Sequence, residues 1–179
     1  SLSLLSISGN NLLCYASCLE SVPSVVYEGM SSCGDKAFCD MVTSTNLASI
    51  NSSYSCGAAS SHCSWSGVQC DGGEVLSLDL SRRLLRGVVP SSLGLLRAMT
   101  SLDLSVNCLS GSIPPSLGTV SSLRALRLDS NQLTGGVPQS LCEVGLDTLT
   151  VSSNLLTCYA ECMSSITTSN YDSSLLMCT

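Results

Sequence analysis

The chain has 179 residues and a formal net charge of −6, so it is long enough for one hydrophobic core and too acidic to favour nucleic acid or an anionic membrane as a partner. Hydrophobic residues make up 44% of it, but charged residues only 11% and aromatic residues only 4%, which predicts an aliphatic core under a hydroxyl-rich surface. No apolar run approaches the roughly 20 residues that a membrane-spanning helix needs. We therefore expect no membrane span in this segment.

The first element in chain order is nearly a copy of the last. Cys14 matches Cys158 at an offset of 144, and the third cysteines of the two copies, Cys33 and Cys178, differ by 145. The other matched pairs are Leu2/Leu146, Leu5/Leu149, Ile7/Val151, Ser8/Ser152, Asn10/Asn154, Leu12/Leu156, Tyr15/Tyr159, Ala16/Ala160, Cys18/Cys162 and Tyr27/Tyr171. We interpret residues 1–33 as the last coil and C-terminal cap of a preceding module in a tandem array. The alternative is an incidental duplicated cap.

Twelve cysteines indicate a cross-linked protein. Metal ligation is the competing explanation, because Cys14 with Cys18 and Cys158 with Cys162 are close pairs. His62 is the only histidine, however, and no Cys-x-x-Cys pair occurs. We therefore expect disulfides formed in an oxidising compartment, a secreted or cell-surface location, and neither a metal nor a cofactor.

Residues 34–74 are the least regular part of the chain. The apolar residues of the stretch 34–50 predict a short helix; they are Ala37, Phe38, Met41, Val42 and Leu47. A Ser- and Gly-rich loop, 51–61, follows and contains the N-glycosylation acceptor Asn51-Ser52-Ser53, which agrees with secretion. The stretch ends in a cysteine–tryptophan–cysteine motif, Cys63, Trp65 and Cys70.

Residues 75–157 contain a repeat of 24 residues. Leu78-Asp79-Leu80-Ser81 recurs as Leu102-Asp103-Leu104-Ser105 and as Leu126-Arg127-Leu128-Asp129. The same step relates Leu85, Leu109 and Leu133; Gly87, Gly111 and Gly135; Pro90, Pro114 and Pro138; and Leu93, Leu117 and Leu141. A fourth unit, one residue shorter, continues the series from Leu146 to Leu156. A period of this length indicates a solenoid.

Each Leu-x-Leu run predicts a short strand whose leucines point inward, and stacked coils would bury them in one continuous core. An asparagine follows three of the four strands, at Asn107, Asn131 and Asn154. We expect these amides to form a structural ladder that bonds the main chain of adjacent coils at the bend. In the first coil Arg83 takes this place, which weakens the ladder there.

The repeats resemble the plant-type leucine-rich repeat, whose coil reads Leu-x-x-Leu-x-Leu-x-x-Asn-x-Leu-x-Gly-x-Ile-Pro, and residues 101–123 match it best. The resemblance implies an α/β solenoid of about four right-handed repeats, with a parallel sheet on the concave side and disulfide-stapled caps. It also implies that residues 34–74 form the N-terminal cap, where Cys63 bonds Cys70 and Trp65 seals the core. Arg83 and Cys142, which stands where Gly94 and Gly118 stand in earlier coils, depart from the pattern.

We expect residues 158–179 to form the C-terminal cap. Disulfide connectivity does not follow from sequence alone. The scheme that the internal copy favours pairs Cys142 with Cys162 and Cys158 with Cys178. It further pairs Cys14 with Cys33 in the preceding cap and Cys39 with Cys56 near the helix, and it leaves Cys18 and Cys108 unassigned.

No residue pattern indicates catalysis, and we expect no enzyme. His62 adjoins the cap motif, with nothing to suggest a nucleophile beside it. Asp79 and Asp103 line up one coil apart; a solvated acidic stripe is the favoured interpretation and a cation site the alternative. The expected concave-face residues are Asp79, Ser81, Asp103, Ser105, Arg127 and Asp129.

Two functions remain open at this stage. The favoured hypothesis is an extracellular structural glycoprotein, in which modules repeat head to tail to form a fibre, stalk or surface coat, with copies of itself as partners. The alternative is a receptor ectodomain or enzyme inhibitor that binds proteins or glycans on its concave face, as similar plant-type repeats do. An ice- or polysaccharide-binding adhesin is a third hypothesis, but its regular threonine ranks are missing.

Overall fold

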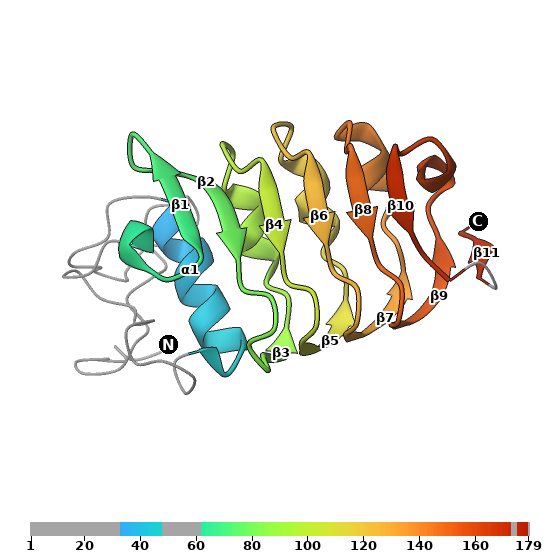
Figure 1. Ribbon diagram of the computed structural model, residues 1–179, viewed down its shortest axis with the longest axis horizontal. Helices are drawn as coiled ribbons and strands as arrows, with labels where there is room; N and C mark the ends of the chain where they lie inside the picture. Colours follow the sequence, from blue (N-terminus) through green and yellow to red (C-terminus); the bar gives the residue numbers. More distant parts are fainter. Residues whose placement is uncertain (1–32, 48–61, 173–174, 179) are drawn as a thin grey trace, which may run out of the picture.

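The structure, a computed structural model, describes residues 33–47, 62–172 and 175–178. Figure 1 shows a row of coils stacked side by side, with helix α1 at one end and strand β11 at the other. The expectations for residues 1–32, for the glycosylation acceptor Asn51, and for the partners Cys14, Cys18 and Cys56 lie outside the described residues.

Each of four coils contains a strand, a bend, a second strand and a 3-10 helix. The first coil is β2 (Glu74–Asp79), β3 (Arg86–Val88) and η2 (Ser91–Leu95); the second is β4 (Ser101–Asp103), β5 (Cys108–Ser112) and η3 (Pro115–Thr119). The third is β6 (Ala125–Arg127), β7 (Gln132–Gly136) and η4 (Gln139–Glu143); the fourth is β8 (Thr148–Thr150), β9 (Leu155–Tyr159) and η5 (Glu161–Ser164). The caps add α1 (Cys33–Ser44), η1 (His62–Ser64) and β1 (Val68–Asp71) before the coils, and β10 (Thr168–Asn170) and β11 (Leu176–Met177) after them.

The predicted leucine-rich solenoid with its parallel sheet is confirmed. The sheet has the strand order β1-β2-β4-β6-β8-β10. Every neighbouring pair from β2 to β10 is parallel, and β1 joins β2 as an antiparallel hairpin. The leucines between the outward-facing residues are fully buried; they are Leu78, Leu102, Leu126 and Leu149. We call the solvent side of this sheet the concave face.

Two features of the architecture were not expected from the sequence. A second parallel sheet, in the order β11-β9-β7-β5-β3, runs along the stack after the bends. In addition, the region predicted as the C-terminal cap supplies β10, a fifth parallel strand of the concave sheet. Thr168, Ser169 and Asn170 in β10 carry no Leu-x-Leu pattern, so hydrophobic periodicity could not reveal this strand.

Helix α1 closes the N-terminal end and overlaps the stretch 34–50 where the sequence predicts a helix, but it begins one residue earlier, at Cys33, which the sequence analysis assigned to the preceding cap. Ala37, Phe38 and Met41 of this helix are buried against the first coil. The ring of Phe38 meets Trp65 edge-on, with centroids 5.1 Å apart, and stacks on His62 at 4.8 Å. Trp65 is buried, as its expected role in sealing the core requires.

The three predicted asparagines bond the main chain at the bends. Asn107 Nδ2 donates to the carbonyl oxygens of Leu80, Leu104 and Ser105, and its Oδ1 accepts from the N–H groups of Arg83 and Leu85. Asn131 and Asn154 also donate to three carbonyl oxygens each, one and two coils on, but the Oδ1 of each accepts a single backbone N–H, from Leu109 and Leu133 respectively. Each amide thereby satisfies buried backbone groups of its own coil and of the preceding one.

The coils approach closely where glycines occur in the 3-10 helices. A Cβ on Gly94 would lie 2.5 Å from the Ser116 carbonyl oxygen, and one on Gly118 would lie 2.5 Å from the Ser140 Cβ. Cys142 replaces this glycine in the third coil and instead bonds Cys162 in η5. At this position the first two coils pack closely against the next coil, whereas the third coil is joined to the C-terminal cap by a disulfide.

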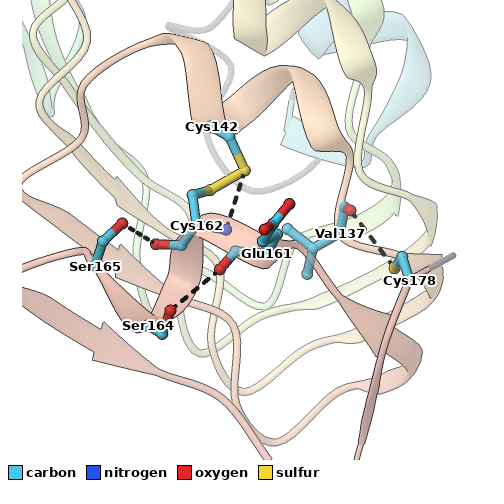
Figure 2. The surroundings of a disulfide bond; sticks show 7 residues. All are labelled: Val137, Cys142, Glu161, Cys162, Ser164, Ser165 and Cys178. Atoms are coloured by element: carbon cyan, nitrogen blue, oxygen red, sulfur yellow. Dashed lines mark hydrogen bonds between the residues drawn. A yellow bond between two sulfur atoms is a disulfide. The ribbon is translucent and has the colours of Figure 1, made fainter.

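Two disulfides fasten the C-terminal cap, with the pairing that the sequence scheme proposes. Figure 2 shows Cys142 bonded to Cys162, whose backbone N–H donates to Cys142 Sγ at 3.3 Å. Cys158 is bonded to Cys178, which places the Cys178 Sγ 3.8 Å from the Val137 carbonyl oxygen.

The N-terminal cap is also cross-linked. Cys63 is bonded to Cys70, the pairing that the resemblance implies. Cys39 is a disulfide cysteine, while its proposed partner Cys56 lies outside the described residues. Among the described cysteines, Cys108 is a free thiol.

Replacing Asn131 by alanine should destabilise the fold, because buried backbone groups of two coils lose their partners. Each unpaired buried polar group costs about 1–3 kcal/mol, so we expect a loss of at least about 2 kcal/mol in the free energy of unfolding. Urea denaturation measures this loss. The control is Gln132→Ala, which changes the exposed neighbour and should shift stability by less than about 0.5 kcal/mol; equal effects of the two variants would refute the structural ladder.

Replacing Gly136 by alanine should strain the C-terminal cap. A Cβ at this position would lie 2.6 Å from Cys158 Sγ and 2.7 Å from Cys178 Sγ, inside van der Waals contact. We expect a loss of about 1–3 kcal/mol, as for other overpacked sites. The same substitution in a Cys158→Ala/Cys178→Ala background should cost much less. An unchanged penalty in that background would show that the disulfide is not the obstacle.

Candidate functional site

The concave face presents two rows of outward-facing side chains, fixed by the register of the parallel strands. The first row is Ser77, Ser101, Ala125, Thr148 and Thr168. The second row is Asp79, Asp103, Arg127, Thr150 and Asn170. The first row is almost entirely hydroxyl groups, whereas the second changes from acidic through basic to neutral along the stack.

The aspartates at the start of the second row are partly committed to their own coils. Asp79 Oδ1 accepts from the backbone N–H of Ser81 at 3.0 Å and from its hydroxyl at 2.7 Å. Asp103 Oδ1 accepts from the same two groups of Ser105, at 2.9 Å and 2.6 Å. One oxygen of each carboxylate, Oδ1, therefore holds the turn after the strand.

Hydrogen bonding favours the ionised form of the Asp79 carboxyl. The backbone N–H of Ser81 is the main cause that lowers the pKa of this carboxyl below its ordinary value. Partial burial acts in the opposite direction, while the Ser81 hydroxyl and the positive charges of Arg83 and Arg127 add to the lowering. Asp79 is therefore a fixed negative charge at neutral pH.

Arg127 is the one cation within the two rows. Arg127 lies in β6, and its register partners on the two neighbouring strands are Asp103 of β4 and Thr150 of β8. Beyond the end of β6, Asp129 Oδ1 accepts from the Thr150 hydroxyl at 2.5 Å. Asp129 is thus tied to the fourth coil, and among the described residues no hydrogen bond or ion pair holds the Arg127 guanidinium.

The structure brings together most of the concave-face residues expected from the sequence. Asp79, Asp103 and Arg127 occupy one row, whereas Ser81 and Ser105 support the two aspartates from the turns. Thr148 and Thr150 of β8 continue the two rows, and β10 adds Thr168 and Asn170, which the sequence did not reveal. Both are exposed on β10, the strand that no repeat pattern announced.

The described residues offer one group of potential metal ligands, and it lies in the N-terminal cap. Atoms of His62, Cys63 and Cys70 lie within 4.8 Å of one another. The two sulfurs are joined in a disulfide, with an S–S distance of 2.00 Å, so they are not thiolate ligands. His62 itself is stacked on Phe38 in the N-terminal cap.

Within the part of the chain that the structure describes, no helix has the length and apolar character required to cross a membrane.

Comparison with known proteins identifies the repeats. The family model "Leucine Rich Repeat" matches residues 98–120 and 122–144. No curated protein sequence matches the chain.

Solved structures extend the likeness beyond the matched repeats. The PEPR1–AtPEP1 complex is 28% identical, with a TM-score of 0.63 over 68% of this chain and 18% of its own. The Arabidopsis receptor kinase HAESA ectodomain, in complex with an N-terminally extended IDA peptide hormone ligand, is 32% identical, with a TM-score of 0.60 over 71% of this chain and 22% of its own. The BIR3–SERK2 complex from Arabidopsis thaliana is 28% identical, with a TM-score of 0.57 over 77% of this chain and 95% of the matched chain.

These findings, together with the stacked coils, define a leucine-rich repeat protein. Its coils and cysteine-bonded caps are of the plant type, and the matched structures include the leucine-rich repeat ectodomain of the receptor kinase HAESA. The chain spans less than a quarter of the matched PEPR1 and HAESA chains, 18% and 22%, but nearly the whole of the chain matched in the BIR3–SERK2 complex.

Acidification should reveal the contribution of Asp79 to stability. Because its pKa is lowered in the folded state, the ionised carboxylate stabilises the fold above its unfolded pKa, and this contribution is lost as the pH falls through the folded pKa. Asp79→Asn should therefore reduce the loss of unfolding free energy between pH 7 and pH 2, measured by urea denaturation. Asp147→Asn, on the loop before β8, is the matched control. A pH dependence equally reduced by both variants would contradict the assignment.

Proposed function

We propose that the chain is an extracellular recognition module that binds a peptide or protein segment across its concave face. The likeness to the HAESA complex carries this proposal, since that structure contains a peptide hormone ligand bound to a leucine-rich repeat ectodomain. The structural fibre favoured from sequence alone has no counterpart among the matched structures. The disulfides of both caps agree with a secreted or cell-surface protein.

The chemistry of the face describes the ligand that would fit it. Hydroxyls of the first row, such as Ser101 and Thr148, can donate to or accept from the main chain of an extended peptide. Asp103 and Arg127 lie side by side in the second row, so a ligand with a basic group and a carboxylate one strand apart would match both. Such a ligand would cross the strands rather than run along one of them.

The module has no need of a catalytic centre for this activity. The matched HAESA ectodomain is in complex with a peptide hormone ligand, and the concave-face residues of this chain are arranged for hydrogen bonding and charge pairing. We assign no cofactor to the proposed site.

A displayed library of linear peptides, panned against the full chain, tests the proposal. Resynthesised enriched peptides should bind the chain in isothermal titration calorimetry, and Arg127→Glu should weaken binding about tenfold or more, because it reverses the one cation of the two rows. The control Arg97→Glu makes the same charge change away from this face, where Arg97 Nη1 donates to the Thr119 carbonyl oxygen at 2.6 Å.

Affinity that survives Arg127→Glu, or that falls equally with Arg97→Glu, would place the binding surface elsewhere. Failure to enrich any peptide would contradict peptide recognition by this module.

The tandem array is a second candidate, supported by the internal copy. The structure shows the role of the copied residues at the C-terminal end. Ala160 is buried, and the Tyr159 and Tyr171 rings stack with centroids 4.8 Å apart. Cys158 is bonded to Cys178, and Cys162 to Cys142. Their counterparts in residues 1–33 keep the same residue types, including Tyr15, Ala16 and Tyr27. We therefore infer that residues 1–33 form an equivalent cap, and an array of such modules could build a fibre or lengthen a receptor.

A further inference from the structure

The bend of the first coil carries an unusual concentration of positive charge. The whole chain has only seven lysines and arginines against thirteen acidic residues, and Arg82, Arg83 and Arg86 fall within five consecutive positions. This segment joins β2 to β3 beside the end of α1, as Figure 1 shows. It lies outside the two rows of the concave face.

Two of these arginines are available to a partner. Arg83 Nη2 donates to the Ser66 hydroxyl at 3.1 Å and so ties the bend to the N-terminal cap. Arg82 and Arg86 are exposed, and among the residues that the structure describes neither guanidinium makes a hydrogen bond or ion pair. Unpaired arginines on a fixed loop are well suited to bidentate pairing with carboxylates.

Two exposed apolar side chains accompany the charge. Leu84, between the arginines, is 72% exposed, and Val106, which occupies the position of Arg82 one coil on, is 40% exposed. Leu84 also has a left-handed backbone, with φ of +54°. Each of the other three coils has one such non-glycine residue at its bend: Val106, Ser130 and Ser153 in turn. The first coil has two, Arg82 and Leu84. The bend therefore holds a leucine outward in a conformation that leucine disfavours.

Asn46 fixes this bend from the N-terminal cap. Its backbone N–H donates to the Arg86 carbonyl oxygen at 3.2 Å, and its side-chain oxygen accepts from the Arg86 N–H at 2.6 Å. The side-chain nitrogen of Asn46 donates to the Leu84 carbonyl oxygen at 3.3 Å. On the other side of Leu84, the Arg83 N–H donates to Asn107 Oδ1 at 3.0 Å. Because the backbone is held on both sides of Leu84, little conformational entropy would be lost when a partner binds.

We propose that Arg82, Leu84, Arg86 and Val106 form a second docking surface, the bend patch, which binds an acidic peptide segment that also carries apolar side chains. Charge complementarity selects the partner: the patch carries two of the seven positively charged residues of a protein whose net charge is −6, so it attracts carboxylates. The exposed Leu84 and Val106 favour a peptide over a polysaccharide acid, which has no aliphatic side chains to cover them.

A fluorescein-labelled peptide of alternating aspartate and leucine is the probe, and fluorescence polarisation with the full chain is the measurement. We expect it to bind about tenfold more tightly than a peptide of alternating aspartate and serine, because only the first covers the apolar part of the patch. Arg86→Glu should weaken binding about tenfold, whereas the matched charge change Arg97→Glu should leave it within about twofold.

Leu84→Asn separates binding from folding. Asparagine tolerates the left-handed backbone better than leucine, so the unfolding midpoint should not fall, while the affinity for the aspartate–leucine peptide should drop. Equal binding of the aspartate–serine peptide or of oligogalacturonate would overturn the proposal, because the patch would then be a general anion attractor. Binding insensitive to Arg86→Glu or Leu84→Asn would overturn it as well. Arg127→Glu distinguishes this surface from the concave face, since it should leave binding to the bend patch unchanged.

Discussion

A coil of this solenoid buries its leucines only where another layer covers it, and that requirement shapes the whole molecule. In the middle of the stack the neighbouring coils provide the cover, and the 24-residue repeat is sufficient. At the two ends of the stack, the caps must cover the leucines that no neighbouring coil covers. Phe38 and Trp65 close the first coil, whereas Ala160 and Met163 close the fourth, and disulfides hold the closing segments in place at each end.

The bends raise a second requirement: the chain turns there while its backbone stays buried, so its N–H and C=O groups need hydrogen-bond partners. Asn107 shows how one amide meets it, with five hydrogen bonds to the main chain of two coils. In the first coil there is no preceding coil to bond, and Arg83 stands in place of the asparagine. Asn46 instead comes from the N-terminal cap and bonds the outer edge of β3. The exposed, arginine-rich bend that results is a consequence of being first in the stack.

The sequence predicts the repeated part of this protein well and the rest less completely. Leucine spacing gives the parallel sheet, and the periodic asparagines predict the ladder, because both depend on contacts that recur every 24 residues. Strand β10 and the role of Asn46 could not be predicted this way, since each occurs once and depends on packing at an end. The concave face was predicted as far as the Leu-x-Leu pattern extends, and Thr168 and Asn170 lie beyond it.

Hydrogen exchange with the disulfides intact and then reduced tests most directly whether the closed ends maintain the stack. If they do, reduction should first expose the backbone amides of β2 and β9, in the first and fourth coils, while those of β4 and β6 in the centre stay protected longest. Loss of protection that begins in the central coils, or no change anywhere on reduction, would contradict this account.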